Sequence, residues 1–72
     1  MNLHPEYIGQ RITKREDRTT KRIYTVIDMY VTRSHITGDI VNVEYLIETY
    51  FIGQRITHTV PTATVALGLI NQ

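Results

Sequence analysis

The stretch Asp39–Phe51, DIVNVEYLIETYF, alternates apolar and polar side chains and so constrains the fold more than any other segment. The apolar residues of one parity are Val41, Val43, Tyr45 and Ile47, and the polar residues of the other are Asn42, Glu44 and Glu48. Because successive side chains of a strand point to opposite faces, this pattern predicts a strand that buries the first set and exposes the second.

A second strand is predicted over residues 21–32, KRIYTVIDMYVT, where β-branched and aromatic residues dominate. Its apolar positions change parity between Val26 and Met29, so we expect a bulge near Ile27 and Asp28. The connecting RSHITGD carries a Gly-Asp turn signal. Residues 21–50 therefore predict one long antiparallel hairpin.

Shorter elements flank this hairpin. YIGQRIT at residues 7–13 and GQRITHTV at residues 53–60 predict two short strands, and Pro61 ends the second because it has no N–H to donate. PTATVALGLI then predicts a single helical turn near residues 62–68, closed by a left-handed Gly68, and a last short strand at Leu69 and Ile70. The expected fold is all-β: a five-stranded antiparallel barrel with one short helical turn before the last strand.

The segments YIGQRI, YTVID and VPTATVALGLI, together with the long hairpin, give the chain a resemblance to a known group of proteins. In this order they resemble the small SH3-like β-barrel accessory proteins of bacteriophages. The resemblance implies a phage-encoded protein that acts in the cytoplasm of the host cell. It assigns no functional residues.

A repeated peptide, YIGQRIT at residues 7–13 and FIGQRIT at residues 51–57, has two interpretations. In the structural one, the aromatic residue and Ile anchor the chain in the core, Gly permits a close or bulged backbone, and Gln and Arg face solvent. In the other, the two Gln-Arg pairs form a polar recognition surface. The flanking residues share no similarity, so a duplicated domain is not expected.

With 72 residues and no cysteine, the chain is expected to form one small domain over residues 1–72, without a disulfide or a reactive thiol. A domain of this size buries only about 60% of the surface of its unfolded chain, so its core is thin. The sequence shows neither a signal-peptide pattern nor an apolar run near the ~20 residues that span a bilayer. We therefore expect a soluble cytoplasmic protein with no membrane partner.

Catalytic chemistry is not indicated. His4, His35 and His58 have no metal-ligand spacing, and Ser34 beside His35 lacks the other parts of a nucleophilic site. Glu44 and Glu48 would lie about 13 Å apart along a strand, too far to act on one glycosidic bond. We predict a non-enzyme with no cofactor and no metal site.

Positive charge is concentrated in residues 11–22, RITKREDRTTKR, which hold six of the eight Lys and Arg residues of a chain with net charge +1. We expect a loop here that binds an acidic surface, because a rigid scaffold commonly presents binding loops. The predicted partner-binding residues are Lys14, Arg15, Arg18, Lys21, Arg22, Tyr30 and Tyr50.

The sequence therefore predicts a protein-binding module that modulates or inhibits a host protein. A nucleic-acid-binding barrel that uses residues 11–22 is the first alternative, although a net charge of +1 is low for that role. A structural subunit that forms homo-oligomers through strand edges is the second.

Overall fold

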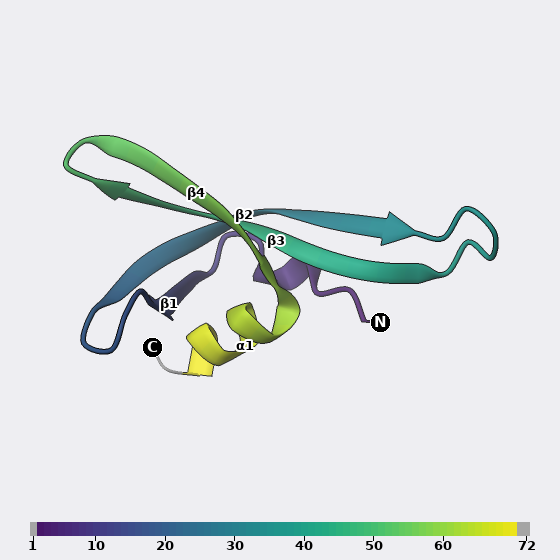
Figure 1. Cartoon of the computed structure of the whole chain (residues 1–72), viewed down its shortest axis with the longest axis horizontal. Helices are drawn as coiled ribbons and strands as arrows, with labels where there is room; N and C mark the ends of the chain where they lie inside the picture. The colour runs from purple at the N-terminus through teal and green to yellow at the C-terminus, as the bar shows by residue number, and fades with distance from the viewer. Residues whose placement is uncertain (1, 71–72) are drawn as a thin grey trace.

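The computed structural model describes residues 2–70, which form one twisted antiparallel sheet and one helix (Figure 1). The strands follow one another in space as in sequence: β1 (Arg11–Arg15), β2 (Lys21–Arg33), β3 (Ile40–Phe51) and β4 (Gln54–Pro61). A short 3₁₀ turn, η1 (Pro5–Tyr7), precedes the sheet, and α1 (Thr62–Ile70) follows it. The mainly β, antiparallel prediction is confirmed. The five-stranded barrel is not observed, because the sheet is open and has four strands in the described part of the chain.

The predicted long hairpin is present as β2 and β3, and its bulge lies where the parity change placed it. The register passes from Val26↔Ile47 to Asp28↔Leu46, so Ile27 is the extra residue. Asp28 is exposed beside the bulge, and its carboxylate accepts the backbone N–H of Met29 at 2.8 Å. The acid that interrupts an apolar strand is therefore solvated and needs no buried partner.

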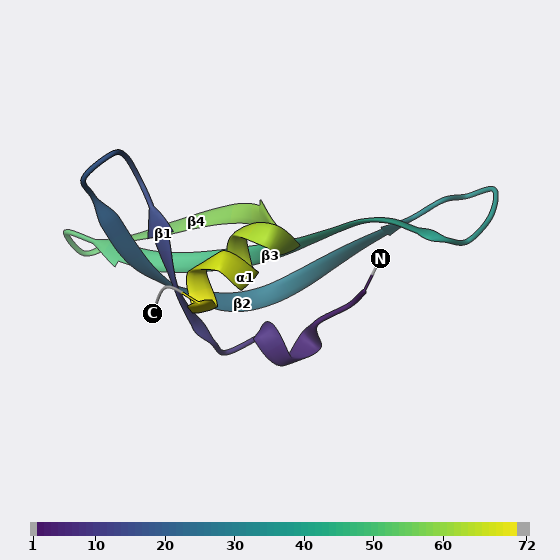
Figure 2. The same ribbon diagram turned by 90° about the horizontal axis from the view of Figure 1, so that it is seen from below.

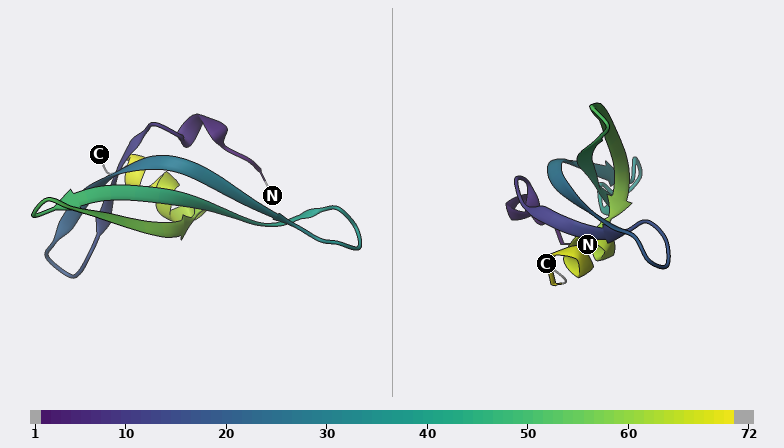
Figure 3. Two further views of the ribbon diagram at one scale, coloured as in Figure 1. Left: turned by 90° about the horizontal axis from the view of Figure 1, so that it is seen from above. Right: turned by 90° about the vertical axis from the view of Figure 1, so that its left-hand side faces the viewer.

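The molecule is elongated, with principal extents of 44 × 25 × 22 Å, because β2 and β3 outrun their neighbours. β1 pairs with β2 only as far as Thr25, and β4 pairs with β3 only as far back as Glu44. Beyond these points residues 31–43 form a two-stranded projection, here called the arm (Figures 1 and 3). The β1–β2 and β3–β4 turns project from the opposite end of the molecule.

Helix α1 replaces both the single helical turn and the last strand that the sequence predicted, so Leu69 and Ile70 are helical. It packs across one face of the sheet, against β1, β3 and β4 (Figure 2). Val65 and Leu69, four residues apart, lie on the same side of the helix and pack into the core. This apolar stripe stabilises a helix that would be marginal alone.

Gly68 allows this close packing, and the prediction that it adopts a left-handed conformation is wrong. It lies within α1, is buried, and is not among the positive-φ glycines. A Cβ at this position would lie 2.8 Å from the Cβ of Ile12 and 2.9 Å from the carbonyl oxygen of Thr13. The absence of a side chain therefore lets the helix rest directly on β1.

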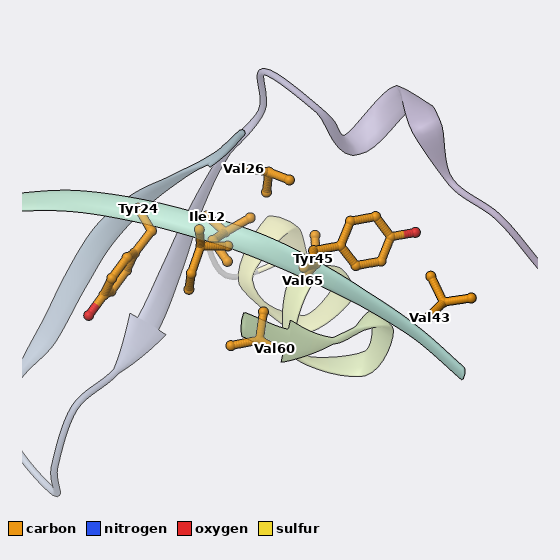
Figure 4. Close-up of a cluster of buried hydrophobic side chains, with 8 residues drawn as sticks. Ile12, Tyr24, Val26, Val43, Tyr45, Val60 and Val65 are labelled. Atoms are coloured by element: carbon orange, nitrogen blue, oxygen red, sulfur yellow. The ribbon is translucent and has the colours of Figure 1, made fainter. Parts of the chain in front are cut away.

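The core lies between the sheet and α1 (Figure 4). Its buried members are Ile12, Tyr24, Val26, Val43, Tyr45, Ile47, Val60 and Val65. Tyr24 and Tyr45 point their hydroxyl groups away from the cluster in opposite directions. The Tyr45 oxygen accepts the backbone N–H of His4 at 3.1 Å, which fixes the N-terminal segment over the core.

Burial of the β3 residues follows the predicted parity only in part: of the residues predicted to be exposed, Asn42 is exposed, but Glu44 and Glu48 are half-buried. Val43, Tyr45 and Ile47 are buried, but Val41 is 52% exposed. A second register shift, from Thr32↔Asn42 to Arg33↔Ile40, leaves Val41 without a partner on β2. It lies further out in the arm than Val43, beyond Glu44, where the pairing of β4 with β3 ends.

The two copies of the repeated peptide form different turns, but each uses a glycine with positive φ. Gly9 and Gly53 both have positive φ, at 92° and 75°, each just before a strand. The glutamines and arginines that follow them are exposed, and Ile12 is fully buried. A backbone role of glycine is confirmed through its positive φ, although neither glycine makes a close approach. Anchoring by the preceding pair holds only for Tyr7, which packs against the core, because Ile8, Phe51 and Ile52 are exposed.

Candidate partner-binding site

A cavity of about 570 Å³ lies between the β1–β2 hairpin and α1. Three of its lining residues are cations that the sequence predicted to bind a partner: Lys14, Arg15 and Lys21. Thr13 and the helix residues Thr64, Leu67 and Gly68 complete the lining. Because the helix residues are spaced i, i+3 and i+4, they share one face of α1. The cavity thus joins a basic side to an uncharged side.

Like charges face each other across the hairpin that carries this cavity. In the β1–β2 register, Arg15 lies opposite Lys21 and Lys14 lies opposite Arg22. Directly opposed like charges destabilise a strand pair, by roughly 0.2–1 kcal/mol. An anionic group bound at the cavity would relieve this repulsion.

Two of these cations have neighbours that moderate their charge. Lys14 Nζ lies 3.5 Å from the carboxylate of Glu16, and the Arg22 guanidinium stacks over the ring of Phe51 at 4.7 Å. Arg15 and Lys21 take part in no ion pair among residues 2–70 and are exposed. Of the four opposed cations, they are therefore the two more available to a ligand.

The two acidic residues of the turn are engaged in local contacts. Asp17 accepts the backbone N–H groups of Thr19 and Thr20, each at 2.8 Å. These bonds order the turn and hold the pKa of Asp17 below its usual value. The Asp17 carboxylate therefore stabilises the conformation of the β1–β2 turn.

Glu16 ties the turn to the core through Tyr24. The Tyr24 hydroxyl donates a hydrogen bond to the Glu16 carboxylate. This bond, assisted by the charge of Lys14, lowers the pKa of Glu16. Burial, together with the same bond, raises the pKa of Tyr24 to about 12. The β1–β2 turn is therefore held to the core of the sheet by a charge-assisted hydrogen bond.

The structure does not bring all of the predicted site residues together. Arg18 lies in the β1–β2 turn outside the cavity lining, and Arg22 is half-buried against Phe51. Tyr30 lies on β2 opposite Glu44, next to the arm, and Tyr50 lies on β3 opposite Arg55. They are 46% and 65% exposed. By strand alternation Tyr50 shares its face with Leu46 and Glu48, which is the face away from α1.

Sequence reasoning missed the uncharged side of the cavity, formed by Thr64, Leu67 and Gly68. The sequence held one signal, because the segment Thr62–Ile70 contains no charged residue. In the fold, Leu67 of this segment is 61% exposed. Its contribution depends on α1 being a helix that approaches β1. The expectation of a terminal strand concealed it.

The histidines lie apart in the fold. His4 stacks on Tyr7, His58 lies 5.9 Å from the Tyr24 ring, and His35 is in the loop of the arm. Among residues 2–70, no three His, Asp or Glu side chains gather where they could hold a metal ion. In the same range, no helix has the length and apolar character needed to cross a bilayer.

Comparisons with protein families, with characterised proteins and with solved structures find no match for this chain. A functional assignment therefore has to start from the fold and from the geometry of the site.

Proposed function

We propose that the protein is a non-enzymatic binding module that holds an acidic segment of another protein in the cavity between the β1–β2 hairpin and α1. The main support is the pair Arg15 and Lys21, which lie opposite each other and take part in no ion pair among the described residues. Both line the cavity, as does Lys14. A carboxylate placed between them replaces repulsion by attraction.

The uncharged side of the cavity defines the partner further. The exposed Leu67 offers apolar surface beside the cations, so the fitting ligand is an acidic side chain next to an apolar one. A phosphate backbone is a poorer fit, since it needs cations along an extended track. Elsewhere Arg55 pairs with Glu48, and Arg33 donates to the Gly38 carbonyl in the arm. A nucleic-acid-binding barrel is therefore the less favoured alternative.

The wider assignment belongs to the same proposal: a phage accessory protein, related to SH3-like barrels, that modulates or inhibits a protein in the host cytoplasm. What supports it is the antiparallel meander with a helical segment after Pro61, together with the small size of the chain. The fit to an acidic protein segment is compatible with such a role.

The test uses the variant Arg15→Glu. This change turns the opposed pair with Lys21 into an attractive one, so the melting temperature should stay level or rise. Capture of the partner from a bacterial lysate should fall at least about tenfold, because an attractive contact becomes repulsive. Loss of binding in a more stable protein cannot come from unfolding. Calorimetry with the purified partner then gives the affinity ratio.

The control variant is Arg11→Glu. It makes the same charge change on the same strand, but Arg11 is outside the cavity lining. We expect it to keep most of the capture. Equal losses for the two variants would show a general charge effect, and undiminished capture by Arg15→Glu would refute the site. Binding of a single-stranded oligonucleotide that Arg15→Glu abolishes would favour the nucleic-acid alternative.

One observation favours the assembly alternative. The outer backbone edges of the arm have no strand partner within residues 2–70, and such edges pair readily with another chain. Light scattering after size exclusion measures this directly. A concentration-dependent dimer that a proline at Val31 abolishes would support edge pairing, since proline removes a ladder donor.

A further inference from the structure

The β3–β4 turn is a tight two-residue turn with an unsuitable residue at its tip. Phe51 pairs with Gln54, so Ile52 and Gly53 form the loop, with φ of 51° and 75°. Positive φ at both positions is the type I′ pattern, which favours Asn-Gly or Asp-Gly. A β-branched residue at positive φ is an outlier, because its Cβ approaches the following carbonyl oxygen. Asn at position 52 would serve the turn better than Ile.

The side chains at this tip are exposed and apolar or aromatic. Ile52 is 86% exposed, Tyr50 65% and Phe51 51%. The turn projects beyond the sheet as a convex point, and α1 does not reach it (Figures 1 and 2). An apolar residue kept in a strained backbone at an exposed tip indicates a contact with something outside the chain.

Cations lie directly behind the tip. The guanidinium carbon of Arg22 lies 4.7 Å from the centroid of the Phe51 ring. The β1–β2 turn, with the exposed Arg18, projects from the same end of the molecule, so both turns face the viewer in the right-hand view of Figure 3. In that turn Asp17 accepts a backbone N–H of the turn and Glu16 accepts the hydroxyl of Tyr24 on β2, while Glu48 pairs with Arg55. This end of the molecule therefore carries the exposed apolar side chains of the β3–β4 turn next to the basic side chains of Arg18 and Arg22.

In contrast to the sequence-based expectation of no membrane partner, we propose that this end of the molecule binds an anionic lipid surface, with Phe51 and Ile52 inserted into the interface and Arg18 and Arg22 against the lipid phosphates. Charge complementarity favours a membrane over a protein pocket. A pocket that received one tip would gain nothing from the second, basic turn, whereas an anionic plane engages both turns at once. Tyr50 fits the headgroup level, where amphipathic rings gather. The residues differ from those of the cavity, so this inference does not depend on the proposed function.

The test is sedimentation of the full chain with vesicles of phosphatidylcholine that contain about one third phosphatidylserine. Wild-type protein should sediment with them, and added salt should weaken the association. Ile52→Asn should melt at a higher temperature than wild type, because Asn tolerates positive φ. The same variant should partition about tenfold less, since one large apolar side chain no longer enters the interface.

Ile36→Asn is the matched control. Ile36 is 94% exposed in the loop of the arm, at the other end of the molecule, so its loss should leave partitioning unchanged. Arg18→Glu tests the electrostatic part and should weaken sedimentation without lowering the melting temperature. Phe51→Trp adds a fluorophore at the tip, and its emission should shift to the blue and be quenched by lipids brominated on their acyl chains.

Three results would overturn the proposal: wild-type protein that stays in the supernatant, equal losses from Ile36→Asn and Ile52→Asn, or indole emission of the Phe51→Trp variant that brominated lipids leave unquenched. A fourth would redirect it. If Ile52→Asn sediments like wild type but no longer captures a protein partner, the tip docks into a protein and the membrane assignment is wrong. Failure of Arg15→Glu to affect capture bears only on the cavity, so the two proposals fail separately.

Discussion

Substitution of Gly68 by alanine tests the packing of α1 on β1, which positions the cavity. The new Cβ would lie 2.8 Å from the Cβ of Ile12, 2.9 Å from the carbonyl oxygen of Thr13 and 3.3 Å from its amide nitrogen. Carbon atoms in good contact are about 3.5–4.0 Å apart, so the helix must retreat by several tenths of an ångström. None of these atoms is the end of a flexible side chain that could rotate away.

Two effects of this substitution oppose each other. Alanine favours the helix over glycine by about 1 kcal/mol. Overpacking of a close interface costs about 1–3 kcal/mol, and rigid partners place this case toward the upper part of that range. Retreat of α1 also loosens Val65 and Leu69, which pack in a core of few residues. We therefore expect a net loss of about 1–2 kcal/mol in the free energy of unfolding.

Thermal unfolding followed by circular dichroism measures this loss. For a domain of this size each kcal/mol corresponds to about 4–8 °C in melting temperature, so the expected decrease is easily resolved. Leu67→Ala is the control, because it places alanine at an exposed neighbouring position of the same helix. An unchanged or higher melting temperature for Gly68→Ala would mean that α1 does not rest on β1 at the distance described.

Two further predictions concern the core and the turn. Val43→Asp should abolish cooperative unfolding, because an unpaired charge enters a core where Val43 is only 4% exposed, and a retained sharp melting transition would contradict the β3 parity. For Tyr24, the folded-state pKa is raised from 10.0 to about 12, so its stabilising effect is complete below pH 10 and is lost as pH rises toward 12. Tyr24→Phe should flatten this alkaline decrease in a pH series of urea midpoints; an equally steep decrease would assign it to other groups.

The strands could be predicted from the sequence because period-two patterns report local geometry. The alternation around Tyr45 identified a buried face, and the parity change between Val26 and Met29 located a bulge that the register confirms. These features need only the fact that one face of the sheet is covered. The pattern does not show how far along β3 the covered face extends, and Val41 lies beyond its end.

The helix was misjudged because its evidence is not local. Thr62–Ile70 is rich in β-branched residues and has Gly68 near its end, which by propensity favours a short turn. What stabilises it is the contact of Gly68 with Ile12 and Thr13, more than fifty positions away in the sequence. A glycine read as a helix terminator is in fact a packing residue, and the two interpretations differ only in three dimensions.

The candidate site was anticipated in its charges but not in its geometry. Clustering of Lys and Arg in residues 11–22 was visible, yet the segment is a paired hairpin and only its turn is a loop. Pairing decides which cations oppose each other, and the register puts Arg15 against Lys21. The acids within the segment, Glu16 and Asp17, accept hydrogen bonds within the hairpin, and these contacts also depend on the pairing.

Both proposed surfaces depart from what local stability favours, and both lie at or near the end of the molecule opposite the arm. The Arg15–Lys21 pair puts like charges together where a Glu or Thr would pair better, and Ile52 holds positive φ where Asn would be relaxed. Both features lower the free energy of unfolding, and a small domain with a thin core has little of it to lose. At the far end, the loop of the arm follows the local rules: Gly38 takes the positive φ, and Ser34 and Thr37 accept backbone N–H groups. The contrast between the two ends is the physical reason to look for partners at the end that carries the β1–β2 and β3–β4 turns.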